Sequence, residues 1–444
     1  MADYLETDME MLGTLQSATF AYFLKYFNPE NGLIADKSKP DSHSSIAAVG
    51  LGITSYVVGI ERNLLSREEG VNRILTVLNF FHDGQQGPEE DAMGYKGFYY
   101  HFLHMDTGRR AWESELSTID TAIFIAGVLT AACYFTGENK AEKEIRNLAE
   151  SLYRRIDWQW ALNGGTMICH GWKPESGFLN YYWNEGYSEA IILYVLALGS
   201  PTFPIDPKGY QEWTSTFKWE NIEGFEYIHA GPLFIHQMSH LWLDFRGIRD
   251  ALNTKYKIDY FENSRRATHV QQLYAMKNPL NFAHYGENNW GFTASDGPGP
   301  AIMMIDGVEK VFYDYIARGV PFGPDDGTIS PWAVIASLPF APDIVLGTVR
   351  HAIKRLKERG SANDGFDASF NPFYTIAGIG GIGWVSPWKF GLNEGPMVIM
   401  IENFRTQFVW NTIKQCEYIT NGLRRAGFTG GWLDQKNLNL RIRY

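Results

Sequence analysis

The sequence predicts a nearly all-helical protein that forms a single domain over residues 1–444. Apolar residues recur at helical spacing in many segments, which are separated by long irregular loops rich in Gly, Trp, Tyr and acids. The short Val/Ile runs that mark parallel-sheet proteins are almost absent, and no fixed-period repeat indicates a solenoid. About twelve helices of roughly 35 residues each, loops included, fit an all-α (α/α)6 toroid with long loops at the end that carries the site.

Helix signals begin in the first half of the chain. Residues 44–59 form an apolar run that predicts a buried helix despite its glycines. Ser66 opens a capping box whose helix is expected to run to about Phe81. Ser117 or Thr118 is expected to cap the next helix, and Gly137 to end it. Two more helices are predicted over 140–156 and 187–199.

The second half shows the same spacing and again lacks a linker or a low-complexity run. Its apolar segments predict helices over residues 232–245, 262–278, 330–339, 342–359 and 396–414.

Composition excludes several classes of protein. The chain has 45% hydrophobic and 20% charged residues, so it can bury a large core and is not disordered. It carries 39 Lys+Arg against 50 Asp+Glu, a net charge of −11, without a basic run. This balance argues against a nucleic-acid partner, because binding phosphates requires cations.

Aromatic residues are abundant: 14 Trp, 24 Tyr and 28 Phe. Most of them are expected to fill the core. A few are expected to face a ligand, because the apolar faces of sugars stack on Trp and Tyr rings.

Three cysteines, Cys133, Cys169 and Cys416, lie far apart without a C-x-x-C pair, so no structural zinc site is expected. The acidic start lacks the basic and apolar regions of a signal peptide. No apolar stretch reaches the roughly 18 residues of a membrane span. We therefore expect a cytoplasmic protein, or a periplasmic one if an export signal was removed, and no membrane partner.

The first cluster of acids lies around a predicted helix start and includes Glu113 and Asp120. Acids are favoured near helix N-termini by the helix dipole, so capping explains them without chemistry. Capping is a weaker explanation for Asp120, because an almost wholly apolar helix follows it and a charge there needs a partner or a role.

Glu189 also stands before an apolar helix, behind the aromatic loop Tyr181–Trp183. A carboxyl beside apolar groups has its charged form desolvated, which raises its pKa. A general acid at neutral pH needs this property. The alternative is an ordinary first-turn acid.

Asp367 is the third candidate, in a loop that Trp384 and Trp388 follow. It is a candidate base that activates water. The alternative is an Asp turn before Pro372, which is common in loops.

Other side chains are expected to order a substrate. His236 and His240, spaced i, i+4, resemble half of an H-E-x-x-H zinc site, but Gln237 replaces the Glu and no third ligand is evident, so no metal is expected. Trp183, Tyr187, Trp290 and Trp384 are candidate stacking platforms. The polar candidates for substrate binding are Glu185, His236, Arg246, Asp296, Asp326 and Glu394. Glu402, inside an apolar helix, must be paired or functional.

Several long strings occur along the chain in a characteristic order. They are SELSTIDTAIFIAG, YSEAIILYVLALGSPTFPI, GPLFIHQMSHLWLDFRGI, NSRRATHVQQ, WGFTASDGP, DDGTISPWAVIASLPFAPD and GPMVIMIENFR. Together they resemble the glucoamylase-like (glycoamylase) family, which contains the bacterial β-1,2-glucan hydrolases of glycoside hydrolase family 144. The resemblance runs from about Asn31 to Arg405.

This resemblance implies an (α/α)6 barrel that hydrolyses β-glucan with inversion. The family's acid matches Glu189, acids of its cleft match Glu113 and Asp120, and its candidate base matches Asp367. One departure is visible. Family members often read Ile-Asp-Gln-Gly near the last helix, whereas this chain reads Leu-Asn-Glu-Gly over 392–395, so that Glu394 is the residue placed to compensate for the missing Asp.

The interpretation is a glycoside hydrolase without a cofactor, acting on an oligo- or polysaccharide. Glu189 donates a proton to the glycosidic oxygen, and Asp367, or Asp120 as the second choice, activates water. The alternatives are a transglycosylase on the same scaffold, a non-catalytic sugar-binding protein and a lyase acting on an acidic polysaccharide. The net charge of −11 disfavours the lyase, which needs cationic subsites.

Overall fold

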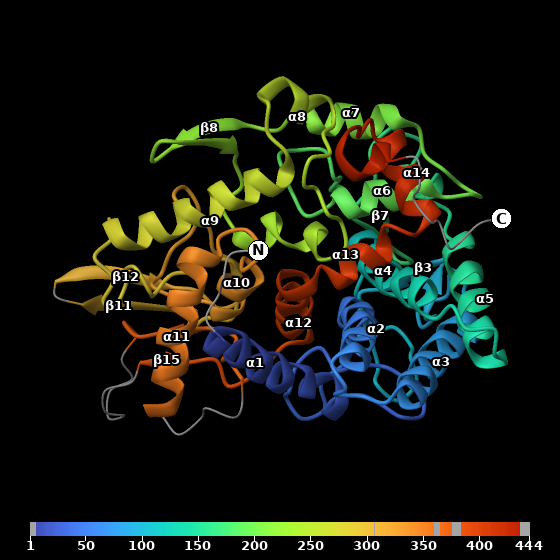
Figure 1. Ribbon diagram of the computed structural model, residues 1–444, viewed down its shortest axis with the longest axis horizontal. Coiled ribbons are helices and arrows are strands. Elements are labelled where there is room, and N and C mark those ends of the chain that lie inside the picture. The colour runs from blue at the N-terminus through green and yellow to red at the C-terminus, as the bar shows by residue number, and fades with distance from the viewer. Residues whose placement is uncertain (1–5, 306, 359–364, 375–382, 436–444) are drawn as a thin grey trace.

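The computed structural model describes residues 6–305, 307–358, 365–374 and 383–435, and over these residues the protein is mainly helical (Figure 1). None of the described helices is long and apolar enough to cross a membrane. The α-helices are α1 (Glu6–Lys25), α2 (Ile46–Glu61), α3 (Arg67–Asp83), α4 (Thr118–Tyr134), α5 (Lys140–Arg154), α6 (Ile191–Gly199), α7 (Pro207–Thr214), α8 (Ala251–Tyr256), α9 (Tyr260–Lys277), α10 (Pro331–Ala336), α11 (Pro342–Glu358), α12 (Gly391–Thr406), α13 (Phe408–Ile413) and α14 (Glu417–Arg425).

Most of the predicted helices are confirmed, with small shifts at their ends. The predicted helix over 232–245 is wrong: this segment forms two 3-10 helices, Leu233–His236 and Met238–Leu241. Its polar side chains bond to neighbouring segments instead, since Gln237 donates to the Ala333 carbonyl (2.6 Å) and Ser239 to the Glu189 carbonyl (2.7 Å). The predicted helix over 396–414 is divided into α12 and α13 by Gln407, which has a left-handed backbone.

Short strands correct the expectation of an almost strand-free chain. A five-stranded antiparallel sheet has the order β2-β3-β5-β6-β7, and β8–β9 and β11–β12 form hairpins. Strands of two or three residues are too short to show an alternating pattern. The strands are β1 (Ser44–Ser45), β2 (Gly94–Tyr95), β3 (Phe98–Tyr100), β4 (Phe102–Leu103), β5 (Leu116–Ser117), β6 (Gly171–Lys173), β7 (Gly177–Phe178), β8 (Trp219–Ile222), β9 (Phe225–Ile228), β10 (Ala294–Ser295), β11 (Ala301–Ile305), β12 (Val308–Phe312), β13 (Ile316–Ala317), β14 (Phe370–Asn371) and β15 (Trp384–Val385).

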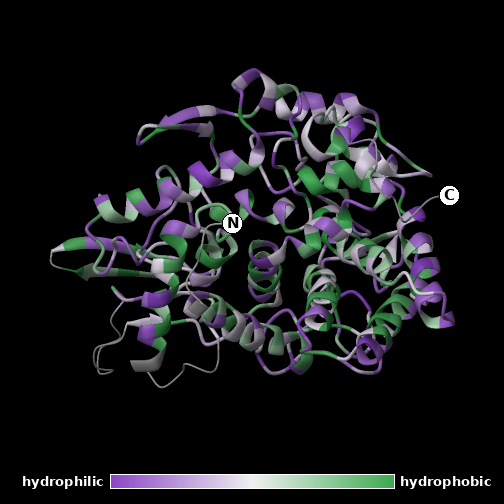
Figure 2. Cartoon of the chain, viewed as in Figure 1, coloured by the Kyte–Doolittle hydropathy of each residue, from purple (hydrophilic) through white to green (hydrophobic). Residues whose placement is uncertain are grey.

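The interior is built from a row of helices, α10, α12, α2, α4 and α6, in which each packs against the next (Figure 1). A second set covers this row: α11 packs on α10, α1 on α12, α3 on α2, α5 on α4 and α14 on α6. The inner helices are buried along nearly their whole length, and Figure 2 shows the hydrophobic colour concentrated on helices such as α6. One hydrophobic cluster extends from Leu12 to Leu433.

Glycines allow α2 and α4 to pack closely against each other. A Cβ at Gly50 would lie 2.5 Å from the Ile123 carbonyl oxygen, and one at Gly127 would lie 2.1 Å from the Gly50 carbonyl oxygen. Any side chain there would force the two helices apart. The glycines of the apolar run therefore bring α2 and α4 together, although glycine lowers the helix propensity of each segment.

A fully buried ion pair, Arg318–Asp326, organises the loops around β10 and β13. Arg318 donates to both oxygens of Asp326 (2.7 and 2.8 Å) and to the carbonyls of Ser295 (2.7 Å) and Tyr313 (3.1 Å). Asp326 also accepts from the Tyr313 amide, and the ion pair with Arg318 holds the pKa of its carboxyl below the usual value although burial acts in the opposite direction. Three loops that are separate in sequence are thereby joined at one guanidinium.

The substitution Asp326→Asn is expected to destabilise the protein by about 3–5 kcal/mol, because it leaves the buried Arg318 charge without a partner. Urea unfolding measures this change. The matched control is Asp91→Asn, which breaks the exposed pair with Arg109 and should cost about 0–1 kcal/mol. Equal losses in both variants would contradict the assigned role of the buried pair.

Helix α12 buries two glutamates in different environments. Glu402 is paired with Arg62 through two bonds of 2.5 and 2.6 Å, which confirms that it is a paired residue, and its pKa is lowered despite burial. Glu394 is 1% exposed and its Oε1 has no hydrogen-bond partner. Burial raises the pKa of Glu394 to about 8, with the Asp367 charge adding to this and Lys389 opposing it. Glu394 is therefore held as a neutral acid at pH 7.

Glu394→Gln is expected to raise the Tm at pH 8.5 and to leave it nearly unchanged at pH 4. A folded-state pKa of about 8, above the ordinary pKa of 4.5 for a glutamate, makes the contribution of this carboxyl to stability fall as pH rises between these values. Gln has no proton to lose and removes that dependence. Glu402→Gln, on the same helix, should lower the Tm at neutral pH, because it weakens the pair with Arg62. A pH-independent Tm difference for Glu394→Gln would contradict the interpretation.

Candidate active site

The charges of four carboxyl groups from distant segments act on one hydroxyl, that of Tyr315. The pKa of Tyr315 is raised by burial of its hydroxyl and by the charges of Asp36, Asp296, Asp120 and Glu189. The residue as a whole is 54% exposed. We name Asp36, Asp120, Glu189 and Asp296 the carboxyl cluster.

The carboxyl cluster lies where several inner helices begin. Asp120 is in the first turn of α4 and Glu189 directly precedes α6. Asp36 lies beside the start of α12, because the Gly391 amide donates to its backbone carbonyl (2.9 Å). Helix dipoles favour negative charge at these ends, which offsets part of the cost of bringing acids together.

Glu189 has the properties of a general acid. Burial raises its pKa to about 7, and the charge of Asp120 contributes in the same direction. Its backbone is held in place by Ser239, whose hydroxyl donates to the Glu189 carbonyl (2.7 Å) and accepts from the Ile192 amide (3.0 Å). A large fraction of Glu189 is therefore protonated at neutral pH, as proton donation requires.

Asp120 is held from two sides. Its amide donates to the Ser117 hydroxyl (3.2 Å), which caps α4, and the same hydroxyl donates to the Asp120 carboxyl. The imidazole Nε2 of His101 lies 3.6 Å from Asp120 Oδ2. The orientation of this carboxylate is thus fixed by Ser117 at the end of β5 and by His101 between β3 and β4.

His101 supplies a positive charge next to the carboxyl cluster. Burial alone would lower its pKa, but Asp120, Glu115 and Asp36 outweigh burial and raise the pKa to about 9. Its Nδ1 is 3.0 Å from Glu115 Oε1, and the pKa of Glu115 is lowered by this contact despite burial. A protonated imidazole therefore offsets part of the repulsion among the acids.

Asp36 and Asp296, the other two members of the carboxyl cluster, differ in their neighbours. Burial raises the pKa of Asp36 to about 6, with Lys37 and His101 opposing and Asp120 and Asp296 adding to the shift. Asp296 accepts a hydrogen bond from Ser386 (3.0 Å), and burial raises its pKa. Asp296 also borders the Arg318 network through the neighbouring Ser295 carbonyl.

The structure brings three predicted residues together, Glu189, Asp120 and Asp296. The charge of Asp367 acts on Glu394, whose pKa it helps to raise. Glu113 is exposed and has a left-handed backbone (φ 53°), and it is Glu115 that contacts His101. The catalytic roles of Asp367 and Glu113 stay predictions.

A second hollow, of about 450 Å³, lies beside the segment that precedes Glu189. Glu185, Tyr181 and Tyr182 line it together with the edge of Trp183. Trp183 is a nearly buried platform: His170 stacks on its ring at 3.8 Å, and its indole N–H donates to Thr118 (3.1 Å). The exposed Tyr181 offers more aromatic surface to a ligand than Trp183 does.

Several residues expected to contact the substrate have their side chains in the core, and their binding roles stay predictions. Trp290 is fully buried and donates to Thr348 (2.9 Å), and Tyr187 stacks on Tyr260. His236 and His240 are buried, which lowers the pKa of each to about 3 and keeps both imidazoles neutral. Aromatic and polar residue types alone do not reveal burial.

Three charged candidates are paired or buried, and their binding roles stay predictions. Asp326 is paired with Arg318 in the core, and Glu394 is nearly fully buried. Arg246 pairs with Asp244 and bonds Gln407, which lies about 20 Å along α12 from Glu394. Trp384 is half-buried in β15 and remains a candidate, since this strand leads to Ser386.

The sequence patterns missed Asp36, His101, Glu115 and Tyr315. Asp36 follows a buried apolar run, whereas Asp120 and Glu189 were identified because each precedes an apolar helix. Tyr315 carries no local signal, because its partners are distant in the chain. Within the described ranges, no group of three or more His, Cys, Asp or Glu side chains is arranged to hold a metal ion.

Comparison with known proteins reveals relatives along nearly the whole chain. An exo β-1,2-glucooligosaccharide sophorohydrolase from Parabacteroides distasonis is 29% identical over 95% of this chain, and the chain spans 58% of that relative's length. The crystal structure of a Bacteroides uniformis protein assigned as a glucoamylase has a TM-score of 0.84 and 29% identity, covering 97% of this chain and 100% of that one. A β-1,2-glucanase from Parabacteroides distasonis has a TM-score of 0.82 and 27% identity, covering 96% of this chain and 60% of that one.

The glycoamylase family model matches residues 180–417, more than half of the chain. The matched part contains Glu189, Asp296 and Tyr315, whereas Asp36 and Asp120 lie before it. This match and the resemblance of the motifs agree, and the chain belongs to the glycoamylase family.

Proposed function

We propose that the protein is a glycoside hydrolase that acts on β-1,2-glucan or its oligosaccharides by general acid and base catalysis with inversion. The observation that carries this proposal is Glu189, which lies just before α6 and whose pKa burial raises to about 7, near the charge of Asp120 in the first turn of α4. The substrate class follows from the sophorohydrolase and glucanase relatives.

In this mechanism Glu189 protonates the glycosidic oxygen as the bond to the sugar breaks. A second carboxylate activates the attacking water on the opposite face of the ring. Asp120 is the first choice for this base, because it shares the cluster with Glu189 and pairs with protonated His101. Asp367 is the second choice, which reverses the order expected from the sequence.

The helix packing supports the (α/α)6 toroid as the scaffold. Five inner helices form a row, and an outer helix covers each of them. The two 3-10 helices at 233–241 take the sixth inner position in this proposal, since Met238–Leu241 packs against α12. A chain of this architecture places the helix starts, and with them the carboxyl cluster, at one end.

Glu189→Gln is expected to lower kcat/KM on linear β-1,2-glucooligosaccharides by about 10²–10⁴-fold, the usual contribution of a general acid. The loss should be much smaller on a 2,4-dinitrophenyl β-sophoroside, because that leaving group departs without protonation. Reducing-sugar release and product sizing measure both reactions. Glu138→Gln, at an exposed position beyond the other end of α4, is the matched control.

Equal losses on both substrates would contradict the acid assignment. Longer oligosaccharides among the wild-type products would indicate transglycosylation, and binding without turnover would indicate a sugar-binding protein.

The value of kcat/KM is expected to fall as the pH rises above about 7, because Glu189 must be protonated to act. In Asp120→Asn, the residual activity should fall at a lower pH, since removal of the Asp120 charge lowers the pKa of Glu189. Initial rates from pH 4 to 9 measure the pH at which the activity falls. Glu113→Gln should leave this pH unchanged because its carboxyl is exposed. An unchanged pH in Asp120→Asn would contradict the effect of the Asp120 charge on the pKa of Glu189.

A further inference from the structure

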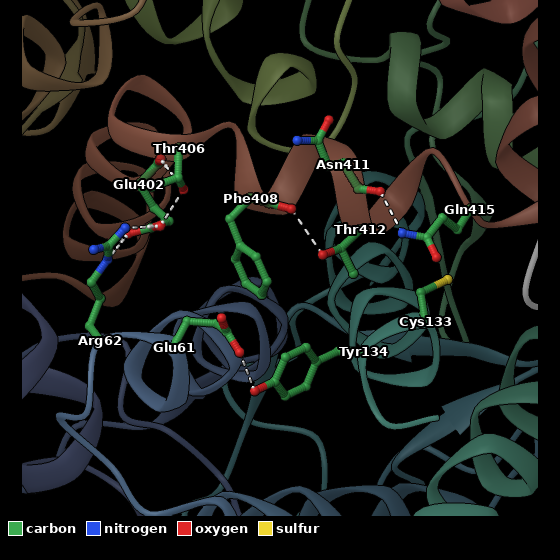
Figure 3. Close-up of a pocket in the computed structure, with 10 residues that line it drawn as sticks. All are labelled: Glu61, Arg62, Cys133, Tyr134, Glu402, Thr406, Phe408, Asn411, Thr412 and Gln415. Atoms are coloured by element: carbon green, nitrogen blue, oxygen red, sulfur yellow. Dashed lines mark hydrogen bonds and ion pairs between the residues drawn. The ribbon is translucent and has the colours of Figure 1, made fainter. Parts of the chain in front are cut away.

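A pocket of about 500 Å³ lies far from the carboxyl cluster, at the opposite ends of the same helices (Figure 3). Glu61 and Tyr134 are the last residues of α2 and α4, and Thr406 ends α12. Asp120 is in the first turn of α4, which makes the separation about 20 Å or more along a helix of this length. The volume lies within the usual range of small-molecule sites, about 300–1,000 Å³.

Charges on the wall of this pocket disfavour an anion. The Arg62 guanidinium is bound by both oxygens of Glu402, and Thr406 also donates to Glu402 (2.6 Å). Glu61 adds a second carboxylate and is exposed. Two carboxylates against one guanidinium leave the wall negative, so a phosphate or sulfate would be repelled.

Glu61 is oriented as an acceptor toward the pocket. The Tyr134 hydroxyl donates to it (2.7 Å), and burial together with this bond raises the pKa of Tyr134, which keeps the hydroxyl protonated. Tyr134 is fixed in turn, since the Arg67 guanidinium packs over its ring at 4.9 Å. Figure 3 shows this pair facing Phe408 across the pocket.

The part of the pocket wall formed by α13 and the residues after it has no charge and offers groups that can form hydrogen bonds. Asn411, Thr412 and Gln415 line it. Gln415 donates to the Asn411 carbonyl (2.9 Å), while its buried Oε1 has no hydrogen-bond partner. A buried amide oxygen without a partner is costly, and a ligand hydroxyl would satisfy it.

Phe408 supplies an apolar surface in the same pocket. Its ring meets Tyr134 edge to face, with centroids 5.8 Å apart, and is half-buried. An aromatic surface beside a carboxylate and amides suits a ligand that has both C–H patches and hydroxyl groups. A wholly apolar ligand would leave the amides and Glu61 without partners.

We propose that this pocket is a second, non-catalytic site that binds one neutral hexose unit, as a free sugar or as the end of an oligosaccharide. Glu61 and the Gln415 oxygen accept sugar hydroxyls, Asn411 donates and accepts, and Phe408 packs against the ring. The proposal uses only the chemistry of the pocket and holds independently of the hydrolytic activity proposed above. Its location allows a sugar to bind there while the carboxyl cluster is occupied.

NMR of the full chain with ¹³C-labelled threonine methyl groups tests this proposal. Thr406 and Thr412 report on the pocket, and Thr118, at the start of α4, reports on the catalytic end. Titration with glucose and with sophorose should shift the Thr406 and Thr412 signals saturably. In the double variant Glu61→Gln/Asn411→Ala, half-saturation of these signals should require at least tenfold more sugar.

The matched control is Glu68→Gln/Asn72→Ala, the same two changes at exposed positions of α3, which should titrate like the wild type. Pocket signals that sugar does not shift, or that shift alike in both double variants, would overturn the proposal. A response to spermidine or sulfate without one to glucose would also overturn it. Failure of the proposed hydrolysis would be seen separately, as intact substrate in the wild-type assay with the Thr412 shift retained.

Discussion

The buried Arg318–Asp326 pair is the interaction on which the site depends most. Five N–H donors in a rigid plane can bind several loops at once, and here they reach one carboxylate and the carbonyls of two loops. Those loops carry Asp296 and Tyr315. Because burial makes an unpaired charge so unfavourable, the pair restricts both loops to one arrangement. The position of half of the site therefore depends on a contact that itself has no chemical role.

The acids of the site are close enough to influence one another, and the fold offsets their repulsion. The starts of α4 and α6 direct positive dipole ends toward Asp120 and Glu189. His101 adds a full positive charge, with a pKa of about 9 that the same acids produce. The residual repulsion and burial then raise the pKa of Glu189 to about 7. Burial and the neighbouring acidic charge thus favour the protonated form of this one carboxyl.

The two ends of the inner helices carry different chemistry. At the starts of α4 and α6, acids with shifted pKa values surround an exposed tyrosine. At the ends of α2, α4 and α12, the acids are paired with Arg62 or with a tyrosine hydroxyl, and amides take up the remaining surface. The first arrangement suits proton transfer, and the second suits binding without reaction. The buried, neutral Glu394 belongs to neither group, although it lies on the helix that joins them.

Local patterns sufficed for most helices, because caps such as Ser66 and Ser117 and continuous apolar runs act within a few residues. They also identified Glu189 and Asp120, since an acid before an apolar helix is conspicuous in sequence. They did not predict that His236, Trp290 and Asp326 are buried, because residue type does not distinguish a group at the surface from a satisfied group in the core. Asp36, His101 and Tyr315 join the site only through contacts between distant segments. Packing of the inner helices and the Arg318 network made those contacts, and with them decided which carboxyls share one electrostatic environment.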